Sequence, residues 1–152
     1  MNKLTPAASA ILLLALAIPV AHAQNQVPGQ HFVENWDLNG DGKVTLEEAK
    51  ERRGDVFASF DTNEDGYLDA EEYVMFDEAR ANDMAEAGGH QRGMRNAAEG
   101  MRLEMNDVDG DGKVSRDEFL GRAKDWLAFL DSNGDGVVTT DDFGRGRGRA
   151  RK

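Results

Sequence analysis

A twelve-residue phrase occurs four times in this 152-residue chain, beginning at Asp37, Asp61, Asp107 and Asp131. The copies read DLNGDGKVTLEE, DTNEDGYLDAEE, DVDGDGKVSRDE and DSNGDGVVTTDD, with oxygen-bearing side chains at positions 1, 3, 5, 9 and 12 and glycine at position 6. Glycine opens backbone conformations that a Cβ opposes, so each copy can turn tightly around its own oxygens. The chain must therefore fold around four loops rather than one continuous element.

The oxygen spacing of each loop suits a hard cation that takes six to eight oxygen ligands, such as Ca²⁺. Positions 1, 3 and 5 present side-chain oxygens, and position 7 contributes only its backbone carbonyl. Position 9 ligates directly or through water, and position 12 closes the site with two carboxylate oxygens. The predicted ligands are Asp37, Asn39, Asp41, Lys43, Thr45 and Glu48; Asp61, Asn63, Asp65, Tyr67, Asp69 and Glu72; Asp107, Asp109, Asp111, Lys113, Ser115 and Glu118; and Asp131, Asn133, Asp135, Val137, Thr139 and Asp142.

A single Asp-rich, Gly-containing stretch is equally compatible with a solvated turn, because Asp, Asn and Gly favour turns for reasons unrelated to metal. Four copies that share an acid at position 12 and an apolar residue at position 8 favour the metal interpretation. The position-8 residues suit a short strand that pairs with another loop. They are Val44, Leu68, Val114 and Val138.

The loops resemble those of the EF-hand superfamily of calmodulin-like calcium-binding proteins, over roughly residues 30 to 144. The resemblance implies an all-α fold of helix–loop–helix repeats, with minimal β-bridges that join the loops in pairs. Apolar residues precede and follow the loops as flanking helices require, although Asn106 departs from this pattern before the third loop. They are Phe32, Val33, Trp36, Phe57, Phe60, Leu103, Trp126, Leu127 and Leu130 before the loops, and Tyr73, Phe119 and Phe143 after them.

The four loops differ in ligand charge, which tunes affinity. The second and third loops each offer four carboxylates and should bind Ca²⁺ most tightly, whereas the first offers three. The fourth has the shorter Asp142 at position 12. We therefore expect up to four Ca²⁺ ions with a weak fourth site, and Mg²⁺ is a possible ion for the loop that starts at Asp131.

The loops repeat in pairs, because 70 residues separate Asp37 from Asp107 and Asp61 from Asp131. Within each pair a 12-residue connector, 49–60 or 119–130, links the two loops. If each connector is one shared helix, it holds its loops about 18 Å apart. The second loop would then pair with the third and the first with the fourth. A kink at Gly54 is the alternative, although no glycine occupies the corresponding place in the second connector.

Residues 1–23 carry a lysine at position 3, an uncharged run and Ala-His-Ala at the end, which predicts a cleavable secretory signal. An uncleaved anchor would need about 20 predominantly apolar residues, and the apolar run here is shorter. Cysteine is absent, which excludes disulfides and a lipid anchor on the new N-terminus. We expect a mature chain from Gln24, periplasmic or secreted, from a Gram-negative bacterium.

The predicted organisation is a first EF-hand pair at 24–86, a Gly-rich hinge or loop at 87–100, a second pair at 101–144 and a disordered basic tail at 145–152. Removing Lys3 from 18 basic residues against 29 acidic ones gives the mature chain a net charge of −12. Four bound Ca²⁺ ions would reduce the net negative charge to about −4. Because this weakens the repulsion within the chain, metal binding should favour the compact state. The tail has three possible fates: a tether to an anionic surface, a contact with the acidic body, or no role.

Five methionines lie in or beside the Gly-rich stretch, at Met75, Met84, Met94, Met101 and Met105, and either fill the core or line a calcium-exposed groove for a protein partner.

His31 and His90 have no metal-site companions, and no catalytic set occurs, so we predict no enzyme. The favoured function is calcium buffering or metal-stabilised structure. A calcium-responsive sensor with a Met-lined surface is the alternative, and nucleic-acid or anionic-surface binding through the Arg-Gly tail is less favoured.

Overall fold

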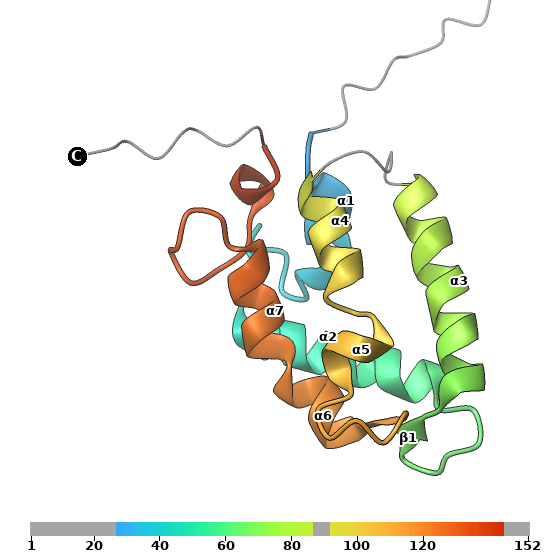
Figure 1. Cartoon of the computed structure of the whole chain (residues 1–152). Helices are drawn as coiled ribbons and strands as arrows, with labels where there is room; N and C mark the ends of the chain where they lie inside the picture. The colour runs from blue at the N-terminus through green and yellow to red at the C-terminus, as the bar shows by residue number, and fades with distance from the viewer. Residues whose placement is uncertain (1–26, 87–91, 145–152) are drawn as a thin grey trace, which may run out of the picture.

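The computed structural model describes residues 27–86 and 92–144, which form helices joined by loops (Figure 1). The predicted all-α class is confirmed, and the only sheet in these residues has two strands of two residues each. In chain order the elements are α1 (Gln30–Trp36), α2 (Leu46–Phe60), β1 (Tyr67–Leu68), α3 (Ala70–Glu86), α4 (Arg92–Glu99), α5 (Leu103–Asn106), β2 (Val114–Ser115), α6 (Arg116–Gly121), α7 (Ala123–Leu130) and the 3-10 helix η1 (Thr140–Asp142).

The end of each loop is also the start of the helix that follows it. Thr45, at position 9 of the first loop, caps α2: its hydroxyl accepts from the Glu48 amide at 3.3 Å, and the Glu48 carboxylate accepts from the Thr45 amide at 3.0 Å. The same reciprocal capping box begins α6 at Ser115 and η1 at Thr139. The loop motif thus carries its own helix-start signal.

The loops associate in two pairs that are not neighbours in the sequence. Strand β1 of the second loop runs antiparallel to β2 of the third, with Leu68 opposite Val114. The first and fourth loops meet at an isolated antiparallel bridge between Val44 and Val138. These pairings are the ones that shared-helix connectors predict, and all four position-8 side chains are fully buried beneath the bridges.

The two connectors pack against each other between the loop pairs, and in Figure 1 α2 crosses the molecule with α3 and α7 on opposite sides. Helix α2 continues through Gly54, so the alternative prediction of a break at this residue is wrong. The second connector, however, is two helices that meet at Arg122, so the prediction of one shared helix is wrong there. Gly121 ends α6 beside this junction, and glycine is a poor helix former. Arg122 keeps helical angles, φ −75° and ψ −8°, so the connector still spans between its loops.

The core contains two clusters of aromatic rings. One joins Phe32, Trp36, Trp126 and Phe143, and the other joins Phe57, Phe60, Tyr73, Phe76 and Phe119, with neighbouring ring centroids 4.5 to 5.9 Å apart. The apolar positions that the sequence places around the loops are all buried or partly buried in this core. Helix packing therefore follows the residues that flank the loops.

The Gly-rich stretch is helical where the structure describes it. Residues 92–99 form α4, so a hinge or loop is wrong for this part, and residues 87–91 lie outside the described residues. A Cβ at Gly93 would lie 2.3 Å from Cδ1 of Phe143, and one at Gly100 would lie 2.3 Å from Cδ1 of Trp126. These glycines let bulky aromatic rings pack directly against the backbone. Ring packing therefore explains their presence, although glycine is a poor helix former.

The methionines differ in burial, and core filling is shown for two of them only. Met94 and Met101 are buried in the core, Met84 is half-buried, and Met75 and Met105 are exposed.

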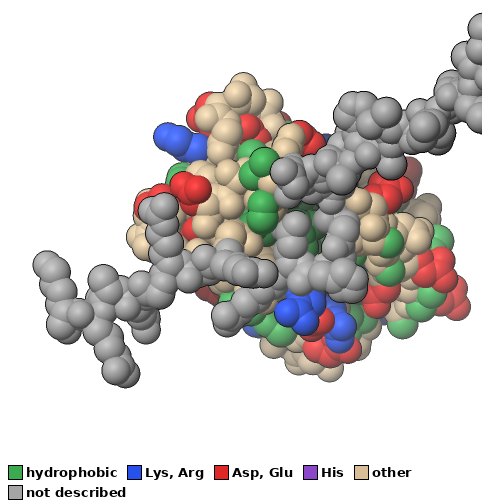
Figure 2. All heavy atoms as spheres, turned by 90° about the horizontal axis from the view of Figure 1, so that it is seen from above, with side chains coloured by type: hydrophobic (Ala, Val, Ile, Leu, Met, Phe, Trp, Pro, Cys, Tyr) green, Lys and Arg blue, Asp and Glu red, His purple; other side chains and the backbone are tan. Residues whose placement is uncertain are grey.

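The predicted signal segment and basic tail fall outside the described residues, and the division into domains stays a prediction. Among the helices described, none combines the length and apolar character needed to cross a membrane. Figure 2 shows acidic side chains on several parts of the face seen from above, in keeping with the net charge of −11.

Candidate functional site

The first carboxylate of each loop organises the turn that follows it. In the first loop Asp37 Oδ1 accepts from the Gly40 amide at 2.7 Å, and Oδ2 accepts from the Gly42 amide at 2.7 Å. The glycine amides at position 6 of the other loops, Gly66, Gly112 and Gly136, bond to their own first carboxylate at 3.1, 3.0 and 2.8 Å. All four have φ between +82° and +91°, a left-handed conformation that favours glycine.

The closing acid of each loop is turned into the loop. Glu48 Oε1 accepts from the amides of Leu38 and Asn39 at 3.1 and 3.2 Å, and Oε2 accepts from the Thr45 amide at 3.0 Å. Glu72, Glu118 and Asp142 accept from the amides at positions 2, 3 and 9 of their own loops in the same way. Both ends of every loop are therefore tied by one carboxylate.

The shorter Asp142 makes these bonds from a tighter turn. Its Oδ1 accepts from the Ser132 amide at 2.9 Å, and its Oδ2 accepts from the Thr139 amide at 2.8 Å. The other three closing acids lie in the first turn of α-helices, whereas Asp142 lies in the 3-10 helix η1. A 3-10 helix winds with fewer residues per turn than an α-helix, so the fourth loop ends in a different backbone conformation from the other three.

The third loop gathers its acids most closely. Ligand atoms of Asp107, Asp109 and Glu118 all lie within 4.8 Å of one another, and no other His, Cys, Asp or Glu set among the described residues meets this criterion. The first, second and fourth loops have asparagine at position 3, where Asp109 supplies a carboxylate. The sequence predicts that the second and third loops bind most tightly, and this ranking stays a prediction.

The remaining predicted ligands line the same turns. Oδ1 of the position-3 residue accepts from the amide of position 5, and Oδ1 of position 5 accepts from the amide of position 7, in each loop. At position 9 of the second loop Asp69 caps α3 by accepting from the Glu72 amide at 3.0 Å. These bonds hold the position-3, position-5 and position-9 side chains against their own loop, and the full ligand sets stay a prediction.

Backbone amides favour the ionised form of these carboxylates. Desolvation works to raise the pKa of Glu48, but hydrogen bonds from Thr45, Asn39 and Leu38 outweigh it and hold the pKa below its usual value. The pKa of Glu118 is lowered in the same way, against desolvation, by Ser115 and the amides near the start of its loop. For Asp37 the amides of Gly42 and Gly40 outweigh desolvation and lower the pKa. Ionised carboxylates are the form that ligates Ca²⁺.

A family model described as EF hand matches residues 36–50, 54–77, 103–120 and 123–146, together more than half of the chain. The chain belongs to the EF-hand family. It is 26% identical over 149 residues to the calcium-binding allergen Ole e 8 of Olea europaea, across 82% of this chain and 84% of that protein. It is 25% identical over 133 residues to the calcium-binding protein LPS1-alpha of Lytechinus pictus, across 75% of this chain but only 39% of that protein.

Membership agrees with the loop geometry, and both of these relatives are named as calcium-binding proteins. Sequence reasoning missed Arg53, a fully buried residue of α2 whose side chain reaches both ends of the third loop. Two signals could have found it. Arg53 follows Ala49 and precedes Phe57 by four residues each, which places it on the apolar face of the helix, and Asn106 is polar where the other loops have apolar residues.

His31 was given no role from the sequence, and the structure places it in a contact between helices. Its Nε2 lies 2.6 Å from Asp83 Oδ1, which joins α1 to α3. Both side chains are partly exposed. His90 lies outside the described residues.

Proposed function

We propose that this EF-hand protein is exported and that its four loops bind Ca²⁺ through the predicted ligands, as a calcium buffer or a metal-stabilised structural protein. The observation that carries the proposal is the position of the closing acids. Each is held in its loop by amides at positions 2, 3 and 9. Sites arranged in this way need little rearrangement to bind, which is the behaviour of buffers rather than sensors.

Charge supports a stabilising role for the metal. The 14 predicted ligand carboxylates are about half of the 29 acidic residues, and without cations they repel one another in four small volumes. No cysteine is present to staple the core with disulfides. A cation that binds the folded state and not the unfolded one stabilises the fold by mass action.

Calorimetric titration of the mature chain with Ca²⁺ tests the binding part of the proposal. We expect up to four sites, with the second and third loops tightest and the fourth weak. A fourth site as tight as the third would contradict the ranking. A chain that binds no Ca²⁺ at millimolar concentration, the weak end of the range for extracellular modules, would contradict the calcium function.

Export is supported by the composition of residues 1–23, and it bears on the role because calcium is usually plentiful outside the cytosol. The test is to express the full chain in a Gram-negative host and to determine the N-terminal residue of the recovered protein. Export predicts a chain that begins at Gln24 in the periplasm or the medium. A chain that keeps Met1 and stays in the cytosol would contradict it.

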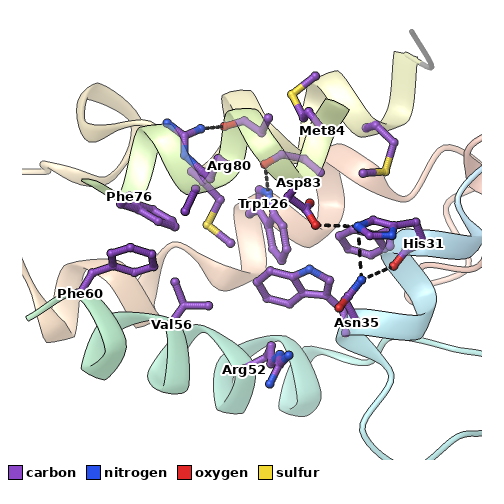
Figure 3. Close-up of a pocket in the computed structure, with 17 residues that line it drawn as sticks. His31, Asn35, Arg52, Val56, Phe60, Phe76, Arg80, Asp83, Met84 and Trp126 are labelled. Carbon is purple, nitrogen blue, oxygen red and sulfur yellow. Dashed lines mark hydrogen bonds and ion pairs between the residues drawn. The ribbon is translucent and has the colours of Figure 1, made fainter. Parts of the chain in front are cut away.

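The sensor alternative has one observation in its favour, an apolar pocket among α1, α2, α3, α4 and α7 (Figure 3). Trp36, Phe60, Phe76, Met84 and Trp126 line it. A sensor must gain exposed apolar surface with Ca²⁺, whereas a buffer need not. We therefore expect a hydrophobic dye to bind the calcium-loaded protein no more than the metal-free one. A strong calcium-dependent gain in dye fluorescence would favour the sensor.

A further inference from the structure

Arg53, in the middle of α2, is a buried cation whose partners are all neutral. It is 0% exposed. Its Nε donates to the Phe119 carbonyl at 2.7 Å, Nη1 to Met101 Sδ at 3.0 Å, and Nη2 to Asn106 Oδ1 at 2.5 Å. No carboxylate in the described part of the chain forms an ion pair with it. Burying a charge without a counter-ion is costly, so this arrangement needs a reason.

Two of these partners bracket the third loop. Asn106 immediately precedes Asp107, the first ligand position, and Phe119 immediately follows Glu118, the closing acid. One planar guanidinium therefore holds the two ends of the loop in a fixed relation to each other. Its rigid fork of donors makes arginine suited to this task.

Aromatic rings compensate part of the cost of burial. The guanidinium carbon lies 4.2 Å from the ring centroid of Phe119 and 5.4 Å from that of Trp126. Cations are attracted to the faces of such rings, and more strongly when desolvated. Burial lowers the pKa of Arg53 to about 10, which leaves the side chain charged at neutral pH.

The arrangement belongs to one half of the repeat only. Seventy residues separate corresponding positions, and Ala123 stands where a second Arg53 would be. Likewise Trp36 corresponds to Asn106, and Ala49 to Phe119. The contact of Arg53 with Asn106 and Phe119, called the Arg53 clamp below, is therefore specific to the third loop. This is also the loop that gathers three carboxylates within 4.8 Å.

We propose that Arg53 is a positioning residue of the third calcium site: it fixes both ends of the loop and couples the site to α2. The inference rests on the proposed calcium binding of the third loop. Residues that orient ligands without touching the metal typically change metal affinity about 10- to 100-fold when replaced.

Calcium titration followed by two-dimensional NMR separates the four sites. The position-6 amides of Gly42, Gly66, Gly112 and Gly136 each bond to the first carboxylate of their own loop, so each resonance follows one site. In the wild-type protein, the Arg53 Nε–H resonance should move at the same calcium concentration as Gly112 and not with Gly136. An Arg53 resonance that ignores the Gly112 transition would overturn the proposal without any variant.

Two variants test the clamp. Arg53→Lys keeps the charge but cannot reach all the acceptors, and Asn106→Leu changes no charge while restoring the apolar residue type found before the fourth loop. We expect each to raise the Gly112 midpoint about 10-fold or more, and to move Gly42 and Gly136 less than about twofold. Arg52→Lys, the same change at the partly exposed neighbouring arginine of α2, is the matched control and should leave Gly112 unchanged.

The double variant shows whether the two residues act together. If they do, Arg53→Lys with Asn106→Leu weakens the third site no more than the stronger single change. If the two changes instead raise the Gly112 midpoint independently, so that their effects multiply, Arg53 and Asn106 do not act as a pair. Equal shifts of the midpoints at all four glycines would show that Arg53 only stabilises the fold. A wild-type Gly112 that ignores Ca²⁺ refutes the calcium function of this loop, and the inference with it. A wild-type response that the variants leave unshifted refutes the inference alone.

Discussion

Val44 and Val138 exchange two backbone hydrogen bonds, of 2.8 and 3.0 Å, and so join the first EF-hand loop to the fourth. The second loop pairs with the third in the same antiparallel sense, with Leu68 opposite Val114. Each loop is thus paired with one from the other half of the repeat. The connectors α2 and α6–α7 set the distance that prevents pairing within a half.

Glu48→Gln should reveal this pairing. The change removes the charge of the closing acid from the first loop, so the Gly42 amide should respond only at much higher calcium. Because the first loop is bridged to the fourth, the Gly136 midpoint should rise about fivefold, the lower end of typical coupling between sites. NMR titration checks both, and Gly66 and Gly112 serve as internal controls. A larger shift at Gly66 than at Gly136 would favour coupling between sequence neighbours instead.

Gly100→Ala should destabilise the fold. The new Cβ would lie 2.3 Å from Cδ1 of Trp126, whose indole N–H donates to the Ala97 carbonyl at 3.0 Å, so the ring cannot move freely. Overpacking of this kind costs about 1 to 3 kcal/mol in free energy of unfolding. Urea denaturation at fixed calcium measures the cost.

Gly121→Ala is the matched control for this substitution, because nothing lies within 4 Å of a Cβ placed there. Gly121 is the last residue of α6, so alanine there should not destabilise the fold and should add less than the roughly 0.5 to 1 kcal/mol found in the middle of a helix. A Gly100→Ala protein as stable as the wild type would show that the Trp126 ring can shift.

Asp142→Glu should strengthen the fourth site. A glutamate reaches further into the loop and brings the closing residue to the type found in the other three loops, so we expect the Gly136 midpoint to fall about tenfold, or about 1.4 kcal/mol. Preference for Mg²⁺ over Ca²⁺ at this loop should fall as well, because bidentate closure suits the larger ion. Titrations with each cation provide the measurement. An unchanged midpoint would mean that the 3-10 turn at Thr140–Asp142 already compensates fully for the shorter side chain.

Acid should destabilise the metal-free protein. The pKa values of Glu48 and Glu118 are lowered in the folded state, so both carboxylates bind protons more readily once the chain unfolds. Their contribution to stability is present above the unfolded pKa, near 4.3, and is lost as pH falls through the lower folded values. Unfolding free energy measured between pH 6 and 3 should decline most steeply below about pH 4.5.

Glu118→Gln is the control for the pH dependence, since an amide does not titrate. Its stability should fall less over the same pH range than that of the wild type. Parallel curves for the two proteins would show that the loop carboxylates do not drive the acid transition.

The loops and their partners could be predicted because the information is local or nearly so. Twelve residues define the turn, the oxygens and the helix start, as the capping box of Thr45 and Glu48 illustrates. The pairing scheme followed from the connector length together with the assumption that each connector is helical and keeps its two loops apart. The ligand assignments stay predictions, although the closing acid of each loop is turned into its loop, as a ligand at position 12 must be.

Other features depend on contacts between distant residues. Gly93 and Gly100 look like helix breakers in the sequence, and only the packing of Phe143 and Trp126 explains them. The break at Arg122 was also missed, because Gly121 matches no glycine in the first connector and a single weak helix former is a poor guide.

The sequence by itself determined that this chain is an all-α protein built on four cation loops, because ligand spacing, glycine position and helix caps act within a few residues. Only the tertiary structure decided which buried groups meet. Arg53 finds Asn106 and Phe119 across more than fifty residues, in a core where a guanidinium is retained by neutral acceptors and ring faces. Such a contact depends on how the helices pack, and no local pattern specifies it.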